Sequence, residues 1–402
     1  MEKASRAAGL RFLVVEDQGF QRWAVEQMLR GMGAAEVFTA ADGKEALAIV
    51  QRNGTIDVIV TDLNMPGMDG IEFIRHVGQI STRASFLLVS AQDPSLIASV
   101  AAMTEAYGAR LVDTIHKPVT AQKLAAALER YRNPEAVADE AQTYTVAEIE
   151  AALRRGEIEP FFQAKIALAT LEVVGAEALA RWRHPQHGIV KPASFVTVLE
   201  REDRMEPLTL LMLARSARAC REWRDAGYRA KVSVNVSLTS LVDVMLADRM
   251  DQIVEGSSLT PADVILEVTE TAAASHLGRV LENLSRLRMK GFGLSIDDFG
   301  TGYASMQQLS RIPFTELKVD QSFVRGAIAG GSSRAVLESS LDIAHKMRID
   351  AVAEGVETEE QLELLRKLGC PLVQGNHFME PVPAAEFLDR LKRRPAARAS
   401  QA

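Results

Sequence analysis

Acidic, amide and lysine side chains fall inside or at the end of almost every strand-like run between residues 160 and 374. They are Glu177, Asn235, Glu267, Asp297, Asp298, Lys318, Asp320, Glu354 and Gln374. A core strand gains nothing from a carboxylate or an ammonium group unless partners offset the loss of hydration. We therefore expect these side chains to meet, and a set of oxygen ligands around one lysine suits Mg²⁺ or Mn²⁺. The few His and Cys residues disfavour a zinc site.

Asp297 and Asp298 are neighbours, so on a regular strand they would point to opposite faces. Both can serve one site only where the strand ends, and residues 299–302 (FGTG) supply that break. Asp297 would then bridge two divalent ions, an arrangement that suits hydrolysis of a phosphodiester. Lys318 would orient the attacking water or stabilise charge on phosphorus, and Glu354 would act beside the metal and as a candidate base. Spacing alone leaves open that these residues form salt bridges without catalysis.

A second set of polar residues follows four strand-like runs of the first third of the chain. It comprises Glu16, Asp17, Asp62, Ser90 and Lys117. Ligand sites of open α/β sheets lie beyond the carboxyl ends of the strands, and three carboxylates there suit Mg²⁺. Asp62 could attack a phosphoryl donor while Ser90 and Lys117 neutralise the phosphoryl oxygens. Any one of these residues alone could be a strand-end cap or a solvated charge, but the complementary set predicts a phosphoacceptor.

The elements that would position both sets follow from the hydrophobic pattern. Residues 10–132 show five strand-helix pairs, which predicts a doubly wound, five-stranded parallel sheet. Eight strand-like runs with helices between most of them predict a modified, TIM-like β/α barrel in the second part. The runs cover residues 160–167, 173–181, 231–237, 264–268, 292–297, 316–319, 351–353 and 371–373. The first two are separated only by residues 168–172, too few for a crossover helix, so we expect that pair to be antiparallel.

Composition narrows the class of protein further. The chain has 402 residues, 47% of them hydrophobic, which allows two or three globular domains and excludes a disordered or fibrous chain. A net charge of -7 disfavours DNA and anionic membrane surfaces as partners. Two distant cysteines offer no disulfide framework, and no stretch reaches 18 apolar residues, so we expect a cytoplasmic location. The predicted domains are residues 1–132 and 145–392, with a linker at 133–144 and a disordered tail at 393–402.

The runs VVED, TDLNMPGMDG, VSA and HKP resemble the receiver domain of two-component response regulators, over nearly all of residues 10–130. The resemblance implies a flavodoxin-like receiver that a partner histidine kinase phosphorylates at Asp62. It also implies that the Asn64 carbonyl joins Glu16 or Asp17 and Asp62 around Mg²⁺. Thr114 stands where many receivers carry a switch Tyr or Phe. We therefore expect intact phosphorylation with altered coupling to the output surface.

The runs GAEALARWRHPQHG, VSVNVS, LEVTE, IDDFGTGYAS, LKVD, VAEGVETEEQ and QGNHF resemble the EAL domain family of cyclic di-GMP phosphodiesterases, over about residues 155–388. The resemblance implies hydrolysis of cyclic di-GMP to linear pGpG with two Mg²⁺ or Mn²⁺ ions, and a dimer or higher homo-oligomer. It assigns Glu177, Asn235, Glu267 and Asp297 to the first ion, and Asp297, Asp298 and Glu354 to the second. It places Lys318 and Asp320 at the catalytic water, with Glu177 and Glu354 also catalytic.

The same resemblance assigns residues around the ions. Gln163, Leu179, Arg181 and Gln374 would contact substrate, Glu357 would support the site, and Glu270 would hold a mobile loop at residues 298–305. The family often reads QPI where this chain has Gln163, Ala164 and Lys165, a departure that removes no metal ligand. Two alternatives remain: a barrel that binds cyclic di-GMP without cleaving it, and a phosphorylation-dependent protein adaptor.

Overall fold

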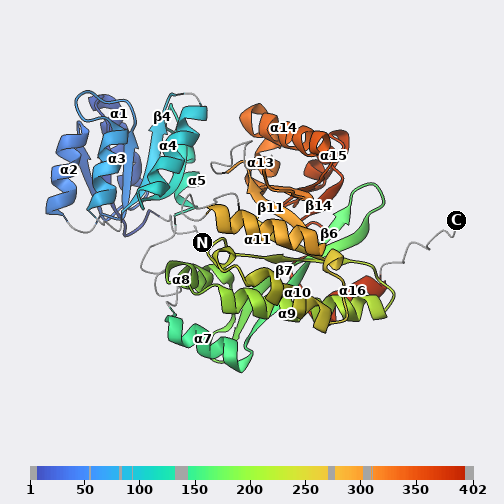
Figure 1. Cartoon of the computed structure of the whole chain (residues 1–402). Helices are drawn as coiled ribbons and strands as arrows, with labels where there is room; N and C mark the ends of the chain where they lie inside the picture. The colour runs from blue at the N-terminus through green and yellow to red at the C-terminus, as the bar shows by residue number, and fades with distance from the viewer. Residues whose placement is uncertain are drawn as a thin grey trace. The chain divides into compact units, whose positions relative to one another are not determined.

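The computed structural model describes residues 7–53, 56–80, 84–92, 94–131, 144–269, 277–301, 309 and 311–393. Its contacts divide the chain into two compact units, Met1–Gln142 and Thr143–Ala402 (Figure 1). We call them the amino-terminal unit and the barrel unit. Nearly all of the predicted linker and tail lies outside the described residues, so the domain limits at 132, 145 and 392 stay predictions.

The amino-terminal unit is an open, wholly parallel sheet of order β2-β1-β3-β4-β5, as the sequence predicted. Its strands are β1 (Arg11–Val15), β2 (Glu36–Ala40), β3 (Val58–Asp62), β4 (Ser85–Ser90) and β5 (Arg110–His116). Its helices are α1 (Gly19–Gly31), α2 (Gly43–Arg52), α3 (Gly70–Gln79), α4 (Pro94–Ala106) and α5 (Ala121–Leu128). Strand order and parallel pairing place the carboxyl ends of β1, β3, β4 and β5 along one edge.

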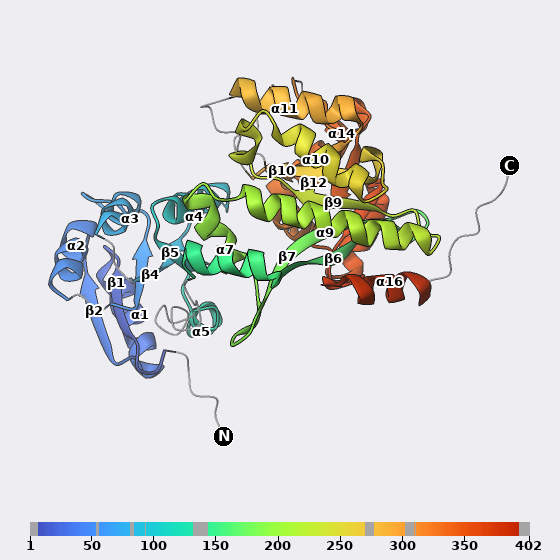
Figure 2. The ribbon, with the colours of Figure 1, turned by 60° about the horizontal axis from the view of Figure 1, so that its bottom comes forward.

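Helices cover both faces of this sheet because its strands are apolar on both sides. Leu13 packs in a core with residues of α2, α3 and α4, whereas Phe12 and Val14 pack in a second core with α1 and α5. Figure 2 shows α2 and α3 on one side of the strands and α1 and α5 on the other. Alternate residues of each strand thus serve opposite cores, as expected for a doubly wound sheet.

The strands of the barrel unit close into a ring. They are β6 (Ile158–Ala167), β7 (Glu172–His184), β8 (Gly188–Val190), β9 (Lys231–Asn235), β10 (Val264–Thr269), β11 (Gly293–Phe299), β12 (Glu316–Val319), β13 (Asp350–Ala353), β14 (Leu372–Gln374) and β15 (Val382–Pro383). The order β6-β14-β13-β12-β11-β10-β9-β7 returns to β6, which makes a closed barrel of eight strands. The short strands β8 and β15 pair with β7 and β6, outside this ring.

One barrel strand runs against its neighbours, as predicted. β6 is antiparallel to both β7 and β14, and the other ring pairs are parallel. The turn between β6 and β7 contains Leu171 at φ 59°, a left-handed conformation that usually favours glycine. A tight turn of this kind leaves no room for a crossover helix, so the two strands form a hairpin.

Helices surround the barrel (Figures 1 and 2). They are α7 (Val146–Arg155), α8 (Val196–Arg201), α9 (Glu206–Asp225), α10 (Leu246–Gly256), α11 (Leu277–Lys290), α13 (Gln321–Gly326), α14 (Gly331–Met347), α15 (Glu359–Lys367) and α16 (Ala384–Arg393). Thr145 and Glu148 form a capping box at the start of α7. Among the described residues, every helix is too short or too polar to cross a membrane.

Candidate functional site

A cavity of about 600 Å³ opens at the carboxyl ends of the barrel strands. Ten residues that the sequence marked line it: Gln163, Glu177, Leu179, Arg181, Asp297, Asp298, Lys318, Glu354, Glu357 and Gln374. Seven that it did not mark also line it: Lys191, Gln321, Gly355, Gly375, Asn376, Glu380 and Pro381. The strand ends that converge there come from segments spread over more than half of the chain, which only barrel closure brings together.

Lys318 occupies the centre of this site, and its side chain is only 1% exposed. Its Nζ lies 2.7 Å from a carboxylate oxygen of Glu354 and 2.9 Å from oxygens of Glu267 and Asp297. A fourth carboxylate, that of Glu177, is 3.3 Å away. Burial alone would lower the pKa of Lys318, but the surrounding carboxylates outweigh it and hold that pKa well above its ordinary value. The lysine is therefore charged.

The carboxylates around Lys318 are under mutual repulsion. Burial, together with the neighbouring carboxylates, raises the pKa of Glu354 to about 8 and that of Asp298 to about 6. Glu267 is the exception: burial would raise its pKa, but Lys165 and Lys318 outweigh that effect and lower it to about 2. The site therefore holds more acid than its two lysines neutralise.

The acids gather into two clusters that share one residue. Glu177, Glu267 and Asp297 each offer an oxygen within 4.8 Å of the others, and so do Asp297, Asp298 and Glu354. Asp298 reaches the same side as Asp297 because its backbone is left-handed, at φ 54°. The break in alternation that the sequence predicted after the two aspartates thus falls at Asp298 itself, where the pairing with β12 also becomes irregular.

Amide side chains frame Glu177. Asn235 donates to its Oε1 at 3.0 Å and Gln374 donates to its Oε2 at 2.6 Å. Gln374 also donates to Gln163 at 3.0 Å, and the amide of Gln163 donates to Asn376. This chain of hydrogen bonds holds the Glu177 carboxylate and connects it to Asn235, Gln374 and Gln163, whose roles toward metal and substrate stay predictions.

Other marked residues lie at the margin or outside the described part. Asp320 caps α13 by accepting a hydrogen bond from the Ser322 backbone N–H at 2.9 Å, and its charge contributes to the raised pKa of Asp298. Glu357 pairs with Arg325 at 3.4 Å. Arg181 donates to the Ala180 carbonyl. Glu270 and residues 302–305 of the expected mobile loop lie outside the described residues.

The sequence did not mark three buried residues that lie beneath the site, which are Lys165, Ser233 and Glu316. Lys165 donates to Ser233 at 2.7 Å, to Glu267 at 2.8 Å and to Glu316 at 2.6 Å. Lys165 follows Gln163 by two residues on β6, and Glu316 precedes Lys318 by two on β12, so each shares a face with a marked residue. This spacing of two residues along a strand was the available signal that Lys165 and Glu316 face the barrel interior.

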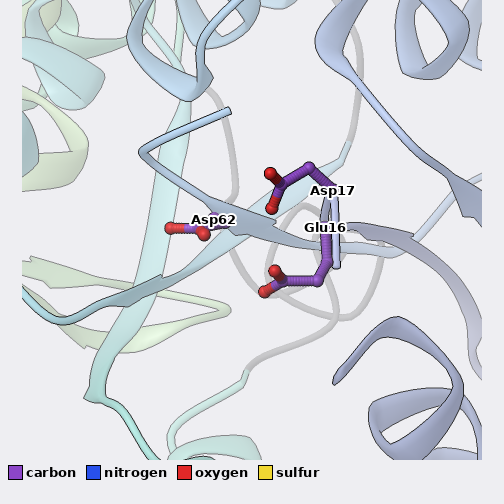
Figure 3. Close-up of side chains that lie close together, drawn as sticks. All are labelled: Glu16, Asp17 and Asp62. Carbon is purple, nitrogen blue, oxygen red and sulfur yellow. The ribbon is translucent and has the colours of Figure 1, made fainter. Parts of the chain in front are cut away.

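The amino-terminal unit has a site of its own at the edge of its sheet (Figure 3). Glu16 and Asp17 follow β1, Asp62 ends β3, and their carboxylates lie within 4.8 Å of one another. Lys117 donates to Asp62 at 2.7 Å and to Glu16 at 2.8 Å. Burial raises the pKa of Glu16. Burial would lower the pKa of Lys117, but hydrogen bonds to Asp62 and Glu16 outweigh it and raise that pKa.

The other residues expected at this site are Asn64, Ser90 and Thr114, and the Mg²⁺ ligation expected of the Asn64 carbonyl stays a prediction. Asn64 donates its backbone N–H to Asp62 at 3.2 Å, and Ser90 ends β4, where its hydroxyl accepts from the Gln92 backbone at 3.0 Å. Thr114 lies on β5, two residues before its end, and is partly buried. The altered coupling expected from Thr114 stays a prediction.

Together, the fold and the two sites define a two-domain α/β protein with an acidic site at the strand ends of each domain. The model of the EAL domain matches residues 146–381, and that of the response regulator receiver domain matches residues 12–129. The chain belongs to the EAL domain family and carries a receiver domain ahead of the EAL domain.

Relatives and solved structures agree with this assignment. The chain is 35% identical over 385 residues to the cyclic di-GMP phosphodiesterase RocR of Pseudomonas aeruginosa, covering 94% of this chain and 98% of RocR. It is 39% identical to the cyclic di-GMP phosphodiesterase NbdA of the same species, over 60% of this chain and 31% of NbdA. The PaMucR phosphodiesterase in complex with c-di-GMP matches with a TM-score of 0.57 and 35% identity, over 60% of this chain and 98% of that one.

Proposed function

We propose that this chain hydrolyses cyclic di-GMP to linear pGpG in its barrel, with two Mg²⁺ or Mn²⁺ ions, under control of phosphorylation at Asp62. The observation that carries the proposal is the pair of acidic clusters that share Asp297. The similarity to RocR over nearly the full length of both chains supports the same substrate and the same domain arrangement.

The donor set fits two hard divalent cations. Every clustered group offers oxygen, the ligand atom that Mg²⁺ and Mn²⁺ prefer. Six carboxylates meet two ammonium groups at the barrel centre: Glu177, Glu267, Asp297, Asp298, Glu316 and Glu354 against Lys165 and Lys318. The excess of four negative charges, when all are ionised, equals the charge of two divalent ions. Glu177, Asn235, Glu267 and Asp297 would hold one ion, and Asp297, Asp298 and Glu354 the other.

When bound, such ions lower the pKa of a coordinated water and offset charge on the phosphodiester oxygens. The chain itself supplies the remaining parts. Lys318 keeps a permanent positive charge at the centre of the site and can donate to the attacking water or to a phosphoryl oxygen. Glu354, which forms an ion pair with Lys318 and lines the cavity, would accept the proton of that water.

Side chains on the cavity wall suit the rest of the substrate. Arg181 offers a guanidinium fork for a phosphate or a guanine edge, and Leu179 offers an apolar contact for a base. Gln163 and Gln374, linked to each other, add amide donors and acceptors. Glu357 also lines the cavity and would support the site.

The amino-terminal site fits the chemistry of a phosphoacceptor. Glu16, Asp17 and Asp62 would hold Mg²⁺, and Asp62 would attack the phosphoryl group that a histidine kinase provides. Lys117 and Ser90 would then face the phosphoryl oxygens. A homo-oligomer and a cytoplasmic location stay predictions from the sequence.

The proposal is tested by incubating the purified full chain with cyclic di-GMP and Mn²⁺ or Mg²⁺ and separating the products by chromatography and mass spectrometry. We expect pGpG to accumulate, and to stop accumulating when a chelator is added. Saturable binding of cyclic di-GMP without any product would support the non-catalytic receptor instead. A partner captured only after phosphorylation, and retained by Glu177→Ala, would support the adaptor.

A further inference from the structure

The barrel carries a buried lysine beneath its proposed metal site that none of the roles above explains. Lys165 is 2% exposed and uses all three of its N–H donors, on Ser233, Glu267 and Glu316. These partners come from β9, β10 and β12, and none of those strands is a neighbour of β6 in the barrel. The side chain therefore crosses the barrel interior to reach them.

Glu267 links this lysine to the site. Its Oε1 accepts from Lys165 at 2.8 Å and its Oε2 accepts from Lys318 at 2.9 Å. The terminal torsion of a glutamate is intrinsically broad, so one hydrogen bond from Lys318 leaves the plane of the carboxylate poorly defined. The second bond, from Lys165, fixes that plane and keeps Oε2 on Lys318, which also contacts Glu177 and Asp297, the other acids of the cluster.

Glu316 explains why the buried ammonium group of Lys165 can orient Glu267 without repelling a metal ion. Glu316 lies 2.6 Å from the Nζ of Lys165 and is itself buried. The pair is neutral as a unit, so it orients Glu267 and adds little net charge beneath the site. Stability alone does not account for the Lys165–Glu316 pair, because well-packed apolar residues in place of a buried ion pair often stabilise a fold as well or better.

We propose that Lys165, neutralised by Glu316, is a positioning residue that holds Glu267 in the orientation required to bind the metal ion. This inference rests on the proposed function, because it assigns a role toward the same ion. Removing a group that orients a metal ligand typically weakens metal affinity by about 10-fold to 100-fold. We expect a loss of that size when Lys165 and Glu316 are made neutral together.

The test uses the double variant Lys165→Met/Glu316→Gln, which keeps the net charge of the wild type. Titration of the metal-free full chain with Mn²⁺ in a calorimeter should give a dissociation constant about 10-fold to 100-fold larger than that of the wild type. Turnover of cyclic di-GMP should fall at limiting Mn²⁺ and recover at saturating Mn²⁺, which a purely structural defect would not allow. Lys231→Met, the same substitution at an exposed lysine of β9, should bind Mn²⁺ like the wild type.

Mn²⁺ binding by the double variant within about threefold of the wild type would overturn the positioning role. If this variant does not fold, judged by circular dichroism and thermal melting in chelator, Lys165→Met/Glu316→Leu leaves no polar group of the pair behind. The same loss of affinity is expected there, and wild-type affinity would again overturn the role. A wild-type chain that binds no Mn²⁺ would instead contradict the metal site itself, and with it both proposals.

Discussion

Each unit of this protein sets a lysine among carboxylates at the carboxyl ends of its strands, yet the two sites differ in depth. Lys117, with a side chain 16% exposed, contacts two acids at the edge of an open sheet, and the third acid, Asp17, is exposed. Lys318, 1% exposed, contacts four acids inside a closed barrel. An open edge gathers few ligands, and Asp62 there is buried, with 6% of its surface exposed. Closure gathers ligands from opposite strands, which a two-ion site requires.

The largest effect is expected when a carboxylate of the barrel site is removed. Glu177→Ala takes away a member of the first cluster and the acceptor of Asn235 and Gln374. We expect turnover of cyclic di-GMP to fall by about 10³-fold, of the order seen when a group that stabilises the transition state is lost, with the fold intact. Steady-state assays and circular dichroism check this.

Lys318→Ala should lose turnover to a similar extent, since it removes the central cation. Glu172→Ala, at the start of the same strand as Glu177, is the matched control and should keep wild-type turnover. Retained hydrolysis in Glu177→Ala or Lys318→Ala would show that the chemistry lies elsewhere.

Metal removal should lower the stability of the barrel unit and stop its turnover. Cation binding to the barrel adds about 2.7 kcal/mol to its stability when the free ion is at 100 times its dissociation constant. Chelation should therefore lower the melting temperature of the barrel unit and abolish turnover, and added Mn²⁺ should restore both. Differential scanning calorimetry of the full chain is the measurement. Equal activity in chelator and in Mn²⁺ would contradict a metal-dependent barrel.

Asp62→Asn tests the site of the amino-terminal unit. It should abolish phosphoryl uptake from a small phosphodonor such as acetyl phosphate, because the nucleophilic carboxylate is gone. Basal turnover in the barrel should stay within about twofold of the wild type, since the two sites belong to separate compact units. Phosphate-affinity electrophoresis and the turnover assay give the two readouts. Total loss of hydrolysis would mean that the barrel depends on the amino-terminal unit for its structure.

The smallest expected effect is on the pH dependence of the metal-free barrel. The pKa of Glu354 is raised to about 8 and that of Asp298 to about 6, so the folded state binds protons more tightly than the unfolded state. Such groups stabilise the fold below their unfolded pKa, near pH 4, and that stability is lost as pH rises through their folded pKa values. Glu267, with its pKa lowered to about 2, acts oppositely, but its contribution changes only below about pH 4.5.

The melting temperature of the metal-free chain should therefore decline between pH 5 and pH 8.5 by a few degrees. Glu354→Gln, which cannot titrate, should flatten part of that decline. A melting temperature that rises steadily across this range would contradict the repulsion described among the barrel acids.

The sequence predicted most of the fold because its periodicities are local. Short apolar runs alternating with helical stretches indicated both sheets, and the five residues between two runs indicated the β6–β7 hairpin. The strands β8 and β15, three and two residues long, carry too few positions to show a period. Asp298 was expected to sit where alternation ends, but its own left-handed backbone makes the break.

Side-chain partners across the barrel were beyond the reach of the sequence. Lys165 and Glu316 are 151 positions apart, and no local pattern marks them as a pair. A lysine on a strand usually faces solvent, so Lys165 gave no signal of burial beyond its spacing of two from Gln163. The clustering of the barrel acids could be predicted because several chemically alike residues recur at strand ends, whereas the position of a single lysine beneath them could not.

The most direct test of the central claim is hydrolysis of cyclic di-GMP by the full chain in H₂¹⁸O with Mn²⁺, followed by mass spectrometry of the product. We predict pGpG that carries one ¹⁸O in its new terminal phosphate, and no such product from Glu177→Ala. Cyclic di-GMP that is bound yet recovered intact and unlabelled would contradict the claim that this barrel is a phosphodiesterase.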